Sequence, residues 1–525
     1  AEVIGHNIIG YDVPVLERLL GTDFSSCKIT DTLVLSRLTD PSREGGHSLD
    51  SWGQRLGFPK GEHSDWDTFS QDMVDYCKQD VLVNVKVYNA LRSVLAGFGS
   101  ESISLEHQVQ SIITKQTDNG WLLDQEHAFI LLAQLKEKKY DLEDKVHETF
   151  KPLPTFIKEI TPKYKKDGTM SVVGLKFLGD QWENYTAPFS RIDYPAFNLG
   201  SRQQIGRYLQ FFGWKPEKFT EKGHIIVDEA ILSKVTGIPE ANMIAEYLMV
   251  QKRIAQVQSW LDAVKDDGRV HGYVNANGAV TGRMTHSSPN VAQVPSSSAP
   301  YGKDCRACWT VPKGYKVVGM DASGLELRML AHYMNDEGYT NEILTGDIHT
   351  ANQLASGVDT RSQAKTFIYA FLYGAGDAKI GSIVGGTAVD GRRLKAKFLS
   401  NTPSLKDLRE RVSVASGRGY VHGLDRRRVA VRSEHSALNT LLQSAGAIVM
   451  KKALCLLDEY ASAWKIDYKF IGNIHDEIQT EVRADEAEVF GRLAVSCIEA
   501  AGIYYKLNCP LAGEYQVGDN WSETH

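Results

Sequence analysis

The sequence predicts a multidomain α/β protein, and three observations support this prediction. The chain has 525 residues, more than the roughly 250–300 that one hydrophobic core usually organises. Its hydrophobic content of 42% and charged content of 24% are ordinary for a globular protein. The predicted secondary structure changes along the chain, from mixed strand and helix, through a helical stretch, to strands that flank acidic residues. We therefore expect several packed domains, and the absence of internal repeats argues against a solenoid.

The first 95 residues are expected to form a small α/β region. A short strand is predicted at Glu2–Ile4, a helix at Tyr11–Leu20 and a longer helix at Ser70–Leu91, because the apolar residues of the helices recur at helical spacing. The run Ile103–Phe150 is also strongly helical.

The middle of the chain is expected to be helical with one interruption. Lys151–Pro195 contains five prolines and three glycines, which break helical periodicity and indicate an inserted or linking segment. Helices are predicted on its far side, at Ser201–Phe212 and Asp228–Val264.

The last part of the chain has a different pattern, with strands next to acidic residues. Tyr315–Met320 is predicted to be a buried strand that leads into Asp321, and helices dominate from Gly324 to about Arg411. A second pair of strands is expected at Phe470–Ile474 and Ile478–Val482.

Two carboxylates follow these predicted strands, and their positions indicate a metal site. Asp321 lies where a buried strand meets solvent, and a buried carboxylate is costly unless it is paired or binds a cation. Asp476 and Glu477 lie at a hairpin tip, where a tight turn would favour Asn-Gly or Asp-Gly instead. If the strands are neighbours, Asp321 and Asp476 suit two Mg²⁺ ions, which lie about 3.5–4 Å apart in two-metal sites. The alternative is that Asp321 merely caps the helix through Arg328.

A basic helix is predicted over Thr360–Gly374, which begins with a capping residue and ends at a glycine. Arg361, Lys365 and Tyr369 recur every four residues, so they share one face. Cations near a helix N-terminus are unfavourable by about 0.3–1 kcal/mol each unless an anion docks there. We therefore expect a triphosphate on this face. The alternative is an exposed basic helix whose aromatic residues pack inward.

The charge of the chain is unevenly distributed. The segment Arg361–Arg432 holds fifteen Lys or Arg against five Asp or Glu, whereas the whole chain has a net charge of −6. A basic segment in an acidic protein is typical of a polyanion site, although a solvated helical face would look the same. No apolar run approaches the ~20 residues needed to cross a bilayer. The seven cysteines show no paired spacing, which favours a reduced, cytosolic protein.

Three segments resemble the polymerase motifs of family A (polymerase I-type) DNA polymerases, in the order of the family. They are Asp321–Arg328, Arg361–Gly374 and His475-Asp476-Glu477. Four further stretches are similar to the replicative branch found in T-seven-like podophages: Asn277–His286, Gly346–Thr350, Asn439–Gly446 and Val517–His525. The resemblance covers nearly the whole chain and is weakest at Lys151–Pro195.

The resemblance implies a template-directed DNA polymerase that adds dNTPs to a primer 3′-hydroxyl with two Mg²⁺ ions. By this resemblance Asp321, Asp476 and the Ala322 carbonyl would ligate the metals, and Glu477 would support the site. The triphosphate would be gripped by Arg361, Lys365 and His349, and Lys365 would also donate a proton to pyrophosphate.

The same resemblance implies how the enzyme would select its substrate. Glu326 would be the steric gate that excludes a ribose 2′-hydroxyl, and Tyr373 would lie beside the templating pair. Tyr369 stands where the family has Phe or Tyr, and Tyr implies ready use of dideoxynucleotides. The residues implied to contact primer-terminal or minor-groove atoms are Arg283, Asn439, Gln443 and His475.

The N-terminal region resembles the 3′–5′ exonuclease domain of the family. The segment that ends in Tyr11-Asp12 looks like its second motif, and Tyr76 and Asp80, one helical turn apart, look like its third. No Asp-x-Glu motif precedes them, so we expect a chain truncated within this domain, with little or no proofreading. An ordinary amphipathic helix would explain Tyr76 and Asp80 in isolation equally well.

Lys151–Pro195 lies where the podophage branch carries a longer insertion that binds a host thioredoxin. Here it is shorter, so a thioredoxin-type processivity factor is doubtful. Basic residues (Lys158, Lys163, Lys165, Lys166 and Lys176) alternate with aromatic residues (Phe156, Tyr164 and Phe177) in this segment. Such interleaving suits contact with a nucleic-acid strand.

The resemblance also predicts a domain order. A partial RNase H-like exonuclease domain (1–95) would be followed by a right-hand polymerase domain whose palm sheet is antiparallel. Its parts would be a thumb with connecting helices (96–265, insertion 151–195), a first palm segment (266–335), fingers (336–432) and a second palm segment (433–525). We expect a monomer that works on primer-template DNA in the cytoplasm of an infected host cell, away from membranes.

Two other functions share some of these features. A single-subunit phage RNA polymerase has the two aspartates and the basic helix, but it lacks counterparts of Glu326 and Glu477. A non-catalytic DNA-binding protein would not need intact acidic residues at 321, 326, 476 and 477.

Overall fold

The computed structural model describes residues 1–171 and 187–524. Contacts within the chain divide it into two compact units. The first unit contains Ala1–Asp124 together with Asp262–His525, and the second contains Gln125–Leu261. Each unit is described by itself.

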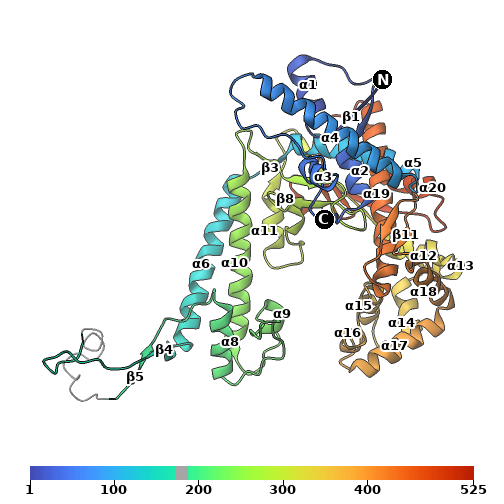
Figure 1. The fold of residues 1–525 in the computed structure, drawn as a ribbon. Helices are drawn as coiled ribbons and strands as arrows, with labels where there is room; N and C mark the ends of the chain where they lie inside the picture. The colour runs from blue at the N-terminus through green and yellow to red at the C-terminus, as the bar shows by residue number, and fades with distance from the viewer. Residues whose placement is uncertain (172–186, 525) are drawn as a thin grey trace. The chain divides into compact units, whose positions relative to one another are not determined.

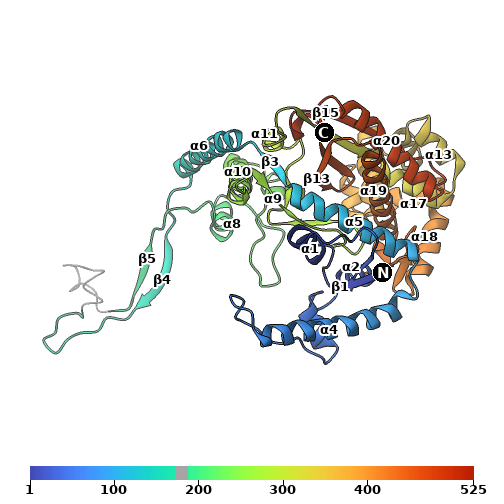
Figure 2. The same cartoon turned by 90° about the horizontal axis from the view of Figure 1, so that it is seen from above.

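The N-terminal part of the first unit is a small α/β layer. Strands β1 (Glu2–Gly5) and β2 (Lys28–Asp31) pair in parallel. The helices are α1 (Asp12–Leu20), α2 (Thr32–Thr39), α3 (Leu49–Arg55) and α4 (Gln71–Leu95). Figure 2 shows α2 between α4 and α5 (Ser100–Asn119), which it contacts on opposite sides. The strand at residue 2 and the helices near residues 11 and 70 that the sequence predicts are confirmed.

The helical run predicted from Ile103 to Phe150 is interrupted at Gly120, and this part of the prediction is wrong. Gly120 has a φ of +60°, and a Cβ there would lie 2.8 Å from the ring of His271. Strand β3 (Trp121–Leu123) follows before the chain enters α6 (Gln125–Thr149). Because α5 packs on α19 (Ala437–Ala463) and on β13 (Tyr468–Ile474), the strand that leads into the later acidic motif, it belongs to the first unit. The boundary expected at residue 96 therefore differs from the boundary between the compact units.

The second unit is built on two long helices. Helix α6 lies along α10 (Pro239–Ala263), as Figure 1 shows, and the Tyr247 hydroxyl donates to Glu143 at 2.9 Å between them. Shorter helices α8 (Arg202–Phe211) and α9 (Glu229–Leu232) complete it. The proline-rich segment forms an antiparallel pair, β4 (Thr155–Ile160) with β5 (Phe189–Asp193). Two residues of the expected basic and aromatic pattern, Lys176 and Phe177, lie outside the described residues.

The core of the first unit is a four-stranded antiparallel sheet with the order β13-β14-β10-β15. The strands are β13 (Tyr468–Ile474), β14 (Glu477–Arg483), β10 (Tyr315–Ala322) and β15 (Gly513–Gly518). Helices α12 (Leu325–Met334), α19 (Ala437–Ala463) and α20 (Ala487–Tyr504) share its hydrophobic core. This antiparallel sheet confirms the class of sheet that was expected.

Short elements connect this sheet to the rest of the first unit. They are β6 (Arg269–Val270), β7 (Tyr273–Asn275), β8 (Thr285–Ser287), η2 (Val291–Gln293), α11 (Gly302–Ala307), β9 (Trp309–Thr310) and η4 (Trp521–Glu523). Strand β3 pairs with both β6 and β9, and the pairing with β9 fixes the end of α11, which lies just before β9 in the chain.

A helical region follows α12, in the lower right of Figure 1. Its helices are α13 (Glu337–Leu344), α14 (Ile348–Ser356), α15 (Arg361–Leu372), α16 (Asp377–Ser382), α17 (Ala388–Asn401) and α18 (Pro403–Ser416). A hairpin of β11 (Tyr420–His422) and β12 (Arg428–Ala430) and the short η3 (Glu434–Ser436) return the chain to α19.

Helix α19 is long and apolar enough to cross a membrane by composition alone, with a mean hydropathy of 1.4 over its most apolar window. However, 78% of that window is buried inside the fold. It is therefore explained as a core helix, and its apolar character needs no lipid.

Four buried charges join the sheet region to the returning hairpin. Glu106 on α5 accepts hydrogen bonds from Lys451 on α19 at 2.7 Å and from Arg427 at 2.5 Å. Arg427 also pairs with Asp425 at 2.6 Å. Two cations thus face two carboxylates, and all four side chains are at least 97% buried. Because Arg427 is inside the protein, it is not part of a basic surface, although the sequence counts it in the basic segment.

Candidate active site

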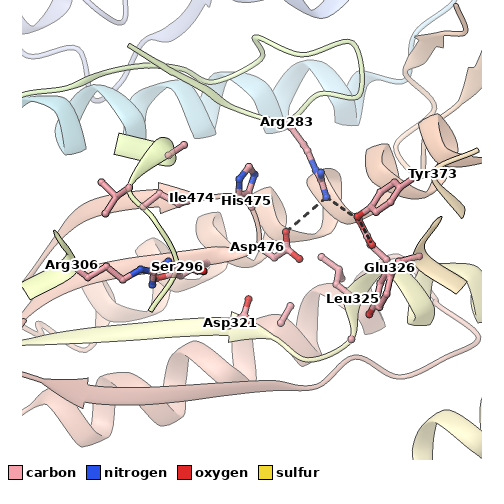
Figure 3. Close-up of a pocket in the computed structure, with 16 residues that line it drawn as sticks. Arg283, Ser296, Arg306, Asp321, Leu325, Glu326, Tyr373, Ile474, His475 and Asp476 are labelled. Carbon is pink, nitrogen blue, oxygen red and sulfur yellow. Dashed lines mark hydrogen bonds and ion pairs between the residues drawn. The ribbon is translucent and has the colours of Figure 1, made fainter. Parts of the chain in front are cut away.

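A cavity of about 620 Å³ lies where the central sheet meets the helical region. It collects residues from segments that are far apart in the sequence, as Figure 3 shows. The side chains that line it and were singled out from the sequence are Arg283, Asp321, Ala322, Glu326, Tyr369, Tyr373, His475, Asp476 and Glu477. The structure therefore brings together nine of the expected polymerase-site residues.

Asp321 lies near the end of β10, between two strands that also carry acids. Glu477 on β14 and Glu514 on β15 are its cross-strand partners. Burial and the nearby carboxylates of Asp476, Glu477 and Glu514 raise the pKa of Asp321 to about 7. Helix α12 is capped by Gly324 without a side-chain bond, so the alternative in which Asp321 caps that helix is wrong. This carboxylate is instead held in a place that repels negative charge and favours a cation.

Asp476 occupies a two-residue turn between β13 and β14. The preceding residue, His475, has a φ of +58°, which is uncommon for a residue with a side chain. A tight hairpin of this length needs such a conformation at its first position. Because β14 is hydrogen-bonded to β10, the turn places Asp476 on the same side of the cavity as Asp321 (Figure 3). The strands are neighbours, as the sequence analysis required.

Glu477 is next to Asp476 in the chain, but its carboxylate is tied into the protein interior. It accepts a hydrogen bond from the indole of Trp521 and another from the amide of Gln479. The guanidinium of Arg306 is 3.7 Å away and stacks over the Trp521 ring at 4.4 Å. With these partners Glu477 is suited to support the turn more than to face a substrate.

A chain of polar contacts crosses the cavity from Asp476 to α15. Arg283 lies 3.9 Å from Asp476 and 3.4 Å from Glu326. The hydroxyl of Tyr373 donates to both oxygens of Glu326, at 2.7 and 2.9 Å. Figure 3 shows Arg283 reaching between the two acids. Glu326 and Tyr373, predicted to have separate roles, are thus in direct contact.

Helix α15 carries the predicted triphosphate face. Thr360 caps it and forms a reciprocal capping box with Gln363, which confirms its predicted start. Arg361 is bound by Asp347, with Nε 2.6 Å from Oδ2, and this contact lowers the pKa of Asp347 strongly. The acid offsets the unfavourable position of a cation at a helix N-terminus.

His349, Arg361 and Lys365 form a group outside the cavity lining. Burial and then the positive charges of Arg361 and Lys365 lower the pKa of His349, so both cations are close enough to interact electrostatically with the ring. The ring of His349 is 6.4 Å from that of Tyr369, which does line the cavity. The basic group is therefore continuous with the cavity along α15.

Two predicted DNA contacts lie on α19. The first turns of this helix are almost wholly buried, but Asn439, Gln443 and Ala447 are half-buried at intervals of four residues. They form a narrow stripe on an otherwise buried helix. Ala447 also borders a small crevice beside Arg283 and His475, so the stripe runs toward the turn that carries Asp476.

The predicted exonuclease residues have different surroundings. Asp80 on α4 is ion-paired with Lys60 at 2.9 Å, and the Lys60 ammonium lies 5.0 Å from the centre of the Tyr76 ring. Asp12 is exposed at the start of α1, where partial burial of its carboxyl raises its pKa. No contact joins Asp12 to Asp80 among the hydrogen bonds and ion pairs of the described residues.

No group of three or more His, Cys, Asp or Glu side chains is placed to hold a metal ion within residues 1–171 and 187–524.

Sequence reasoning missed Arg306, Gln479 and Trp521. Trp521 lies in a stretch that matched the podophage branch, and Gln479 follows the Asp-Glu pair, but neither has a chemical pattern of its own. Arg306 lies between Cys305 and Cys308, and nothing in the sequence around it indicates a role at the site. Only the fold places these three side chains around Glu477.

The polymerase domain model described as DNA polymerase family A matches residues 176–523. The chain belongs to DNA polymerase family A. The DNA-directed DNA polymerase of Escherichia phage T7 is 37% identical over all of this chain and 92% of its own length, and that of Enterobacteria phage T3 gives the same values. DNA polymerase I of Aquifex aeolicus is 24% identical over 99% of this chain and 88% of its own length.

A solved structure gives the same fold. It is the POL domain of Pol1 from M. smegmatis in complex with DNA primer-template and dNTP, with a TM-score of 0.76. The two sequences are 20% identical, and the superposition covers 94% of this chain and 82% of the M. smegmatis chain. The family, the fold class and the enzyme class of DNA-directed DNA polymerase predicted from the sequence are confirmed. The comparisons do not favour an RNA polymerase or a non-catalytic binding protein.

Proposed function

We propose that this family A polymerase uses Asp321 and Asp476 to hold two Mg²⁺ ions for the transfer of dNTPs to a primer 3′-hydroxyl. The observation that supports this most strongly is their placement on adjoining strands at one cavity, where the pKa of Asp321 is raised to about 7. Raised pKa values at a cavity are typical of functional carboxylates.

The residues present fit such ions. The donors are carboxylate oxygens and the Ala322 carbonyl, which hard cations prefer. A divalent cation would also relieve the repulsion among Asp321, Asp476 and Glu477. When bound, two such ions would activate the attacking hydroxyl and stabilise charge on the leaving phosphates.

Helix α15 would hold the triphosphate. Arg361, Lys365 and His349 supply cationic and donor groups, and Lys365 would give a proton to the departing pyrophosphate. Arg361 is bound to Asp347, so it must share or exchange that partner for a phosphate. Because these side chains lie outside the cavity lining, we propose that the helical region closes on the cavity when a correct nucleotide is bound.

The contact between Glu326 and Tyr373 would determine which nucleotide sugar the site accepts. Glu326 would occupy the space that a ribose 2′-hydroxyl needs, and its bond to Tyr373 holds it there. Tyr373 would lie beside the templating pair. Tyr369 would lie beside the sugar and accept dideoxynucleotides.

The primer-template DNA would contact Arg283, His475 and the stripe of Asn439 and Gln443 on α19. These contacts would test the shape of the base pair in the minor groove, where sequence information is degenerate. In domain terms, we propose a thumb between residues 96 and 265, a palm formed by 266–335 and 433–525, and fingers at 336–432.

Residues 1–95 are proposed to be an exonuclease domain with impaired proofreading. Asp80 is neutralised by Lys60, and no hydrogen bond or ion pair joins it to Asp12 within the part of the chain that the structure describes, so this pair is poorly suited to hold a metal. We also propose that the enzyme acts in the cytoplasm of an infected host cell, because two of its relatives are phage polymerases. We further propose that it works without a thioredoxin-type factor.

Extension of a 5′-labelled, self-priming DNA hairpin tests the proposed site. We expect Asp321→Asn and Asp476→Asn each to reduce single-turnover incorporation by at least about a thousandfold, because each removes a metal ligand. Asp485→Asn is a matched control, since this exposed acid pairs only with Arg483 among the contacts described for it. Full activity of either site variant would refute the proposed metal pair.

A second comparison tests the substrate gate. Glu326→Ala should raise incorporation of rNTPs relative to dNTPs by at least about tenfold, because the 2′-hydroxyl then finds space. Efficient rNTP use by the unmodified enzyme would contradict the assignment of Glu326. Added thioredoxin should leave the length of the extension products unchanged.

A further inference from the structure

The carboxylate of Glu477 is held by an interior network that the proposed chemistry does not use. Glu477 is 6% exposed, and the two residues that donate to it, Trp521 and Gln479, are fully buried. Trp521 donates from its indole nitrogen at 2.5 Å. Because Glu477 directly follows Asp476, whatever fixes its side chain also fixes one end of the His475–Asp476 turn.

The donors themselves are fixed from behind. The Thr524 hydroxyl donates to Gln479 at 2.9 Å, and the ring of Trp521 lies 4.9 Å from that of Trp121. Strand β10 leaves room for this arrangement at Gly319, where a Cβ would lie 2.5 Å from the Gln479 amide and 2.6 Å from the Thr524 carbonyl. The short η4 segment is thereby held against the strand that carries Asp321.

Simple filling of the core does not account for this geometry. Trp121 is also buried, and its indole nitrogen has no hydrogen-bond partner in the described parts of the chain. The tryptophan cluster therefore packs without needing an acceptor for every indole. Trp521 differs because its nitrogen is directed at the acid beside Asp476.

We propose that Trp521 is a positioning residue for the polymerase site. Its indole N–H, aided by Gln479, holds the Glu477 carboxylate inside the protein and so keeps Asp476 directed at the cavity. Groups that orient a metal ligand typically change metal affinity or activity by about 10- to 100-fold when removed. This inference rests on the proposed role of Asp476 as a metal ligand.

The test compares Trp521→Phe with Trp121→Phe, two substitutions that remove the same atoms from neighbouring buried rings. A second form of the enzyme carries 3-benzothienylalanine at position 521, which keeps the bicyclic shape and lacks the N–H. Three quantities are measured: kcat and KM for primer extension, the melting temperature, and the affinity for Mn²⁺ alone from the electron paramagnetic resonance signal of free Mn²⁺.

We expect both changes at position 521 to lower kcat by about 10- to 100-fold and to weaken Mn²⁺ binding, with KM for DNA within about twofold of the original value. Trp121→Phe should lower the melting temperature by a similar amount while kcat and Mn²⁺ affinity stay unchanged. Unchanged kcat and Mn²⁺ affinity in the benzothienylalanine enzyme would overturn the proposal, whatever the phenylalanine variant does.

Asp476→Asn separates this inference from the proposed function. If Asp476→Asn abolishes extension while both changes at 521 are silent, only the role of Trp521 is refuted. If Asp476→Asn retains extension, the proposed metal pair itself is refuted, and the inference falls with it.

Discussion

The chain holds two pairs of predicted metal-binding aspartates, and the structure treats them differently. Asp321 lies on strand β10, and Asp476 lies on the turn that joins the neighbouring strand β14 to β13; both line one cavity with a third acid nearby. Asp12 and Asp80 lie on separate helices, and Asp80 is paired with Lys60. In the first pair, Asp321 is repelled by nearby carboxylates even though Arg283 lies 3.9 Å from Asp476, whereas in the second a lysine takes the place that a cation would fill.

The surroundings of the first pair are also more deeply buried than those of the second. The turn with Asp476 is supported by a buried carboxylate with three partners. Four buried charges also tie α5 and α19 to the hairpin of β11 and β12. Near Asp80 the ion pair is partly exposed, at about 22% for both side chains. Repulsion can be maintained at a site only where the surrounding structure is rigid enough to resist it.

The largest effect on stability is expected from the buried charges that support the polymerase site. In Glu106→Gln, Asp425 is the acid of this group that remains to pair with Arg427 and Lys451. The free energy of unfolding should therefore fall by about 3–5 kcal/mol. Urea unfolding measures this difference. Glu2→Gln, which breaks the exposed pair with Lys28, is the control and should leave the midpoint unchanged. Equal shifts of the urea midpoint in Glu106→Gln and Glu2→Gln would show that the buried charges stabilise the protein no more than an exposed pair does.

A smaller effect of opposite sign is expected at Asp321 without metal. Its folded pKa of about 7 lies above the ordinary value of 3.8. Between these values the folded protein keeps a proton that the unfolded chain releases, so stability falls as the pH rises. Asp321→Asn stays neutral, so in EDTA at pH 8 it should melt a few degrees above the original protein, and at pH 4 the two should agree. A lower melting temperature for the variant at pH 8 would show that burial and the nearby carboxylates do not disfavour the ionised form of Asp321.

The smallest effect is expected at the exonuclease pair. Because Lys60 already neutralises Asp80, Asp80→Ala should leave digestion of single-stranded DNA with Mg²⁺ at its original low level. Gel analysis of a 5′-labelled oligonucleotide measures this. Robust digestion that disappears in Asp80→Ala would show that this pair does hold a metal, and the contrast between the two sites would fail.

Much of the polymerase site could be predicted because its residues lie in contiguous motifs. A buried strand before Asp321, a hairpin around Asp476 and a capped basic helix are local patterns, and the structure contains all three. The break at Gly120 was missed because it depends on the ring of His271, which is 151 positions away in the chain.

Contacts between distant segments could not be predicted. Nothing in the local sequence shows that Trp521 and Arg306 meet at Glu477, or that Arg427 is buried against Glu106 while its neighbours in the basic segment are exposed. Likewise, the bond between Tyr373 and Glu326 joins two motifs that the sequence presents separately. Sheet register and helix packing decide these contacts, and a linear pattern does not contain them.

The number of metal ions bound in a stalled complex tests the central claim most directly. Enzyme, a dideoxy-terminated primer-template and the next dNTP would be titrated with Mn²⁺, and binding to the nucleic acid and nucleotide alone would be subtracted. We predict two bound ions in the original enzyme and in Asp80→Asn, and fewer in Asp321→Asn and Asp476→Asn. Two ions retained in Asp476→Asn, or an ion lost in Asp80→Asn, would contradict it.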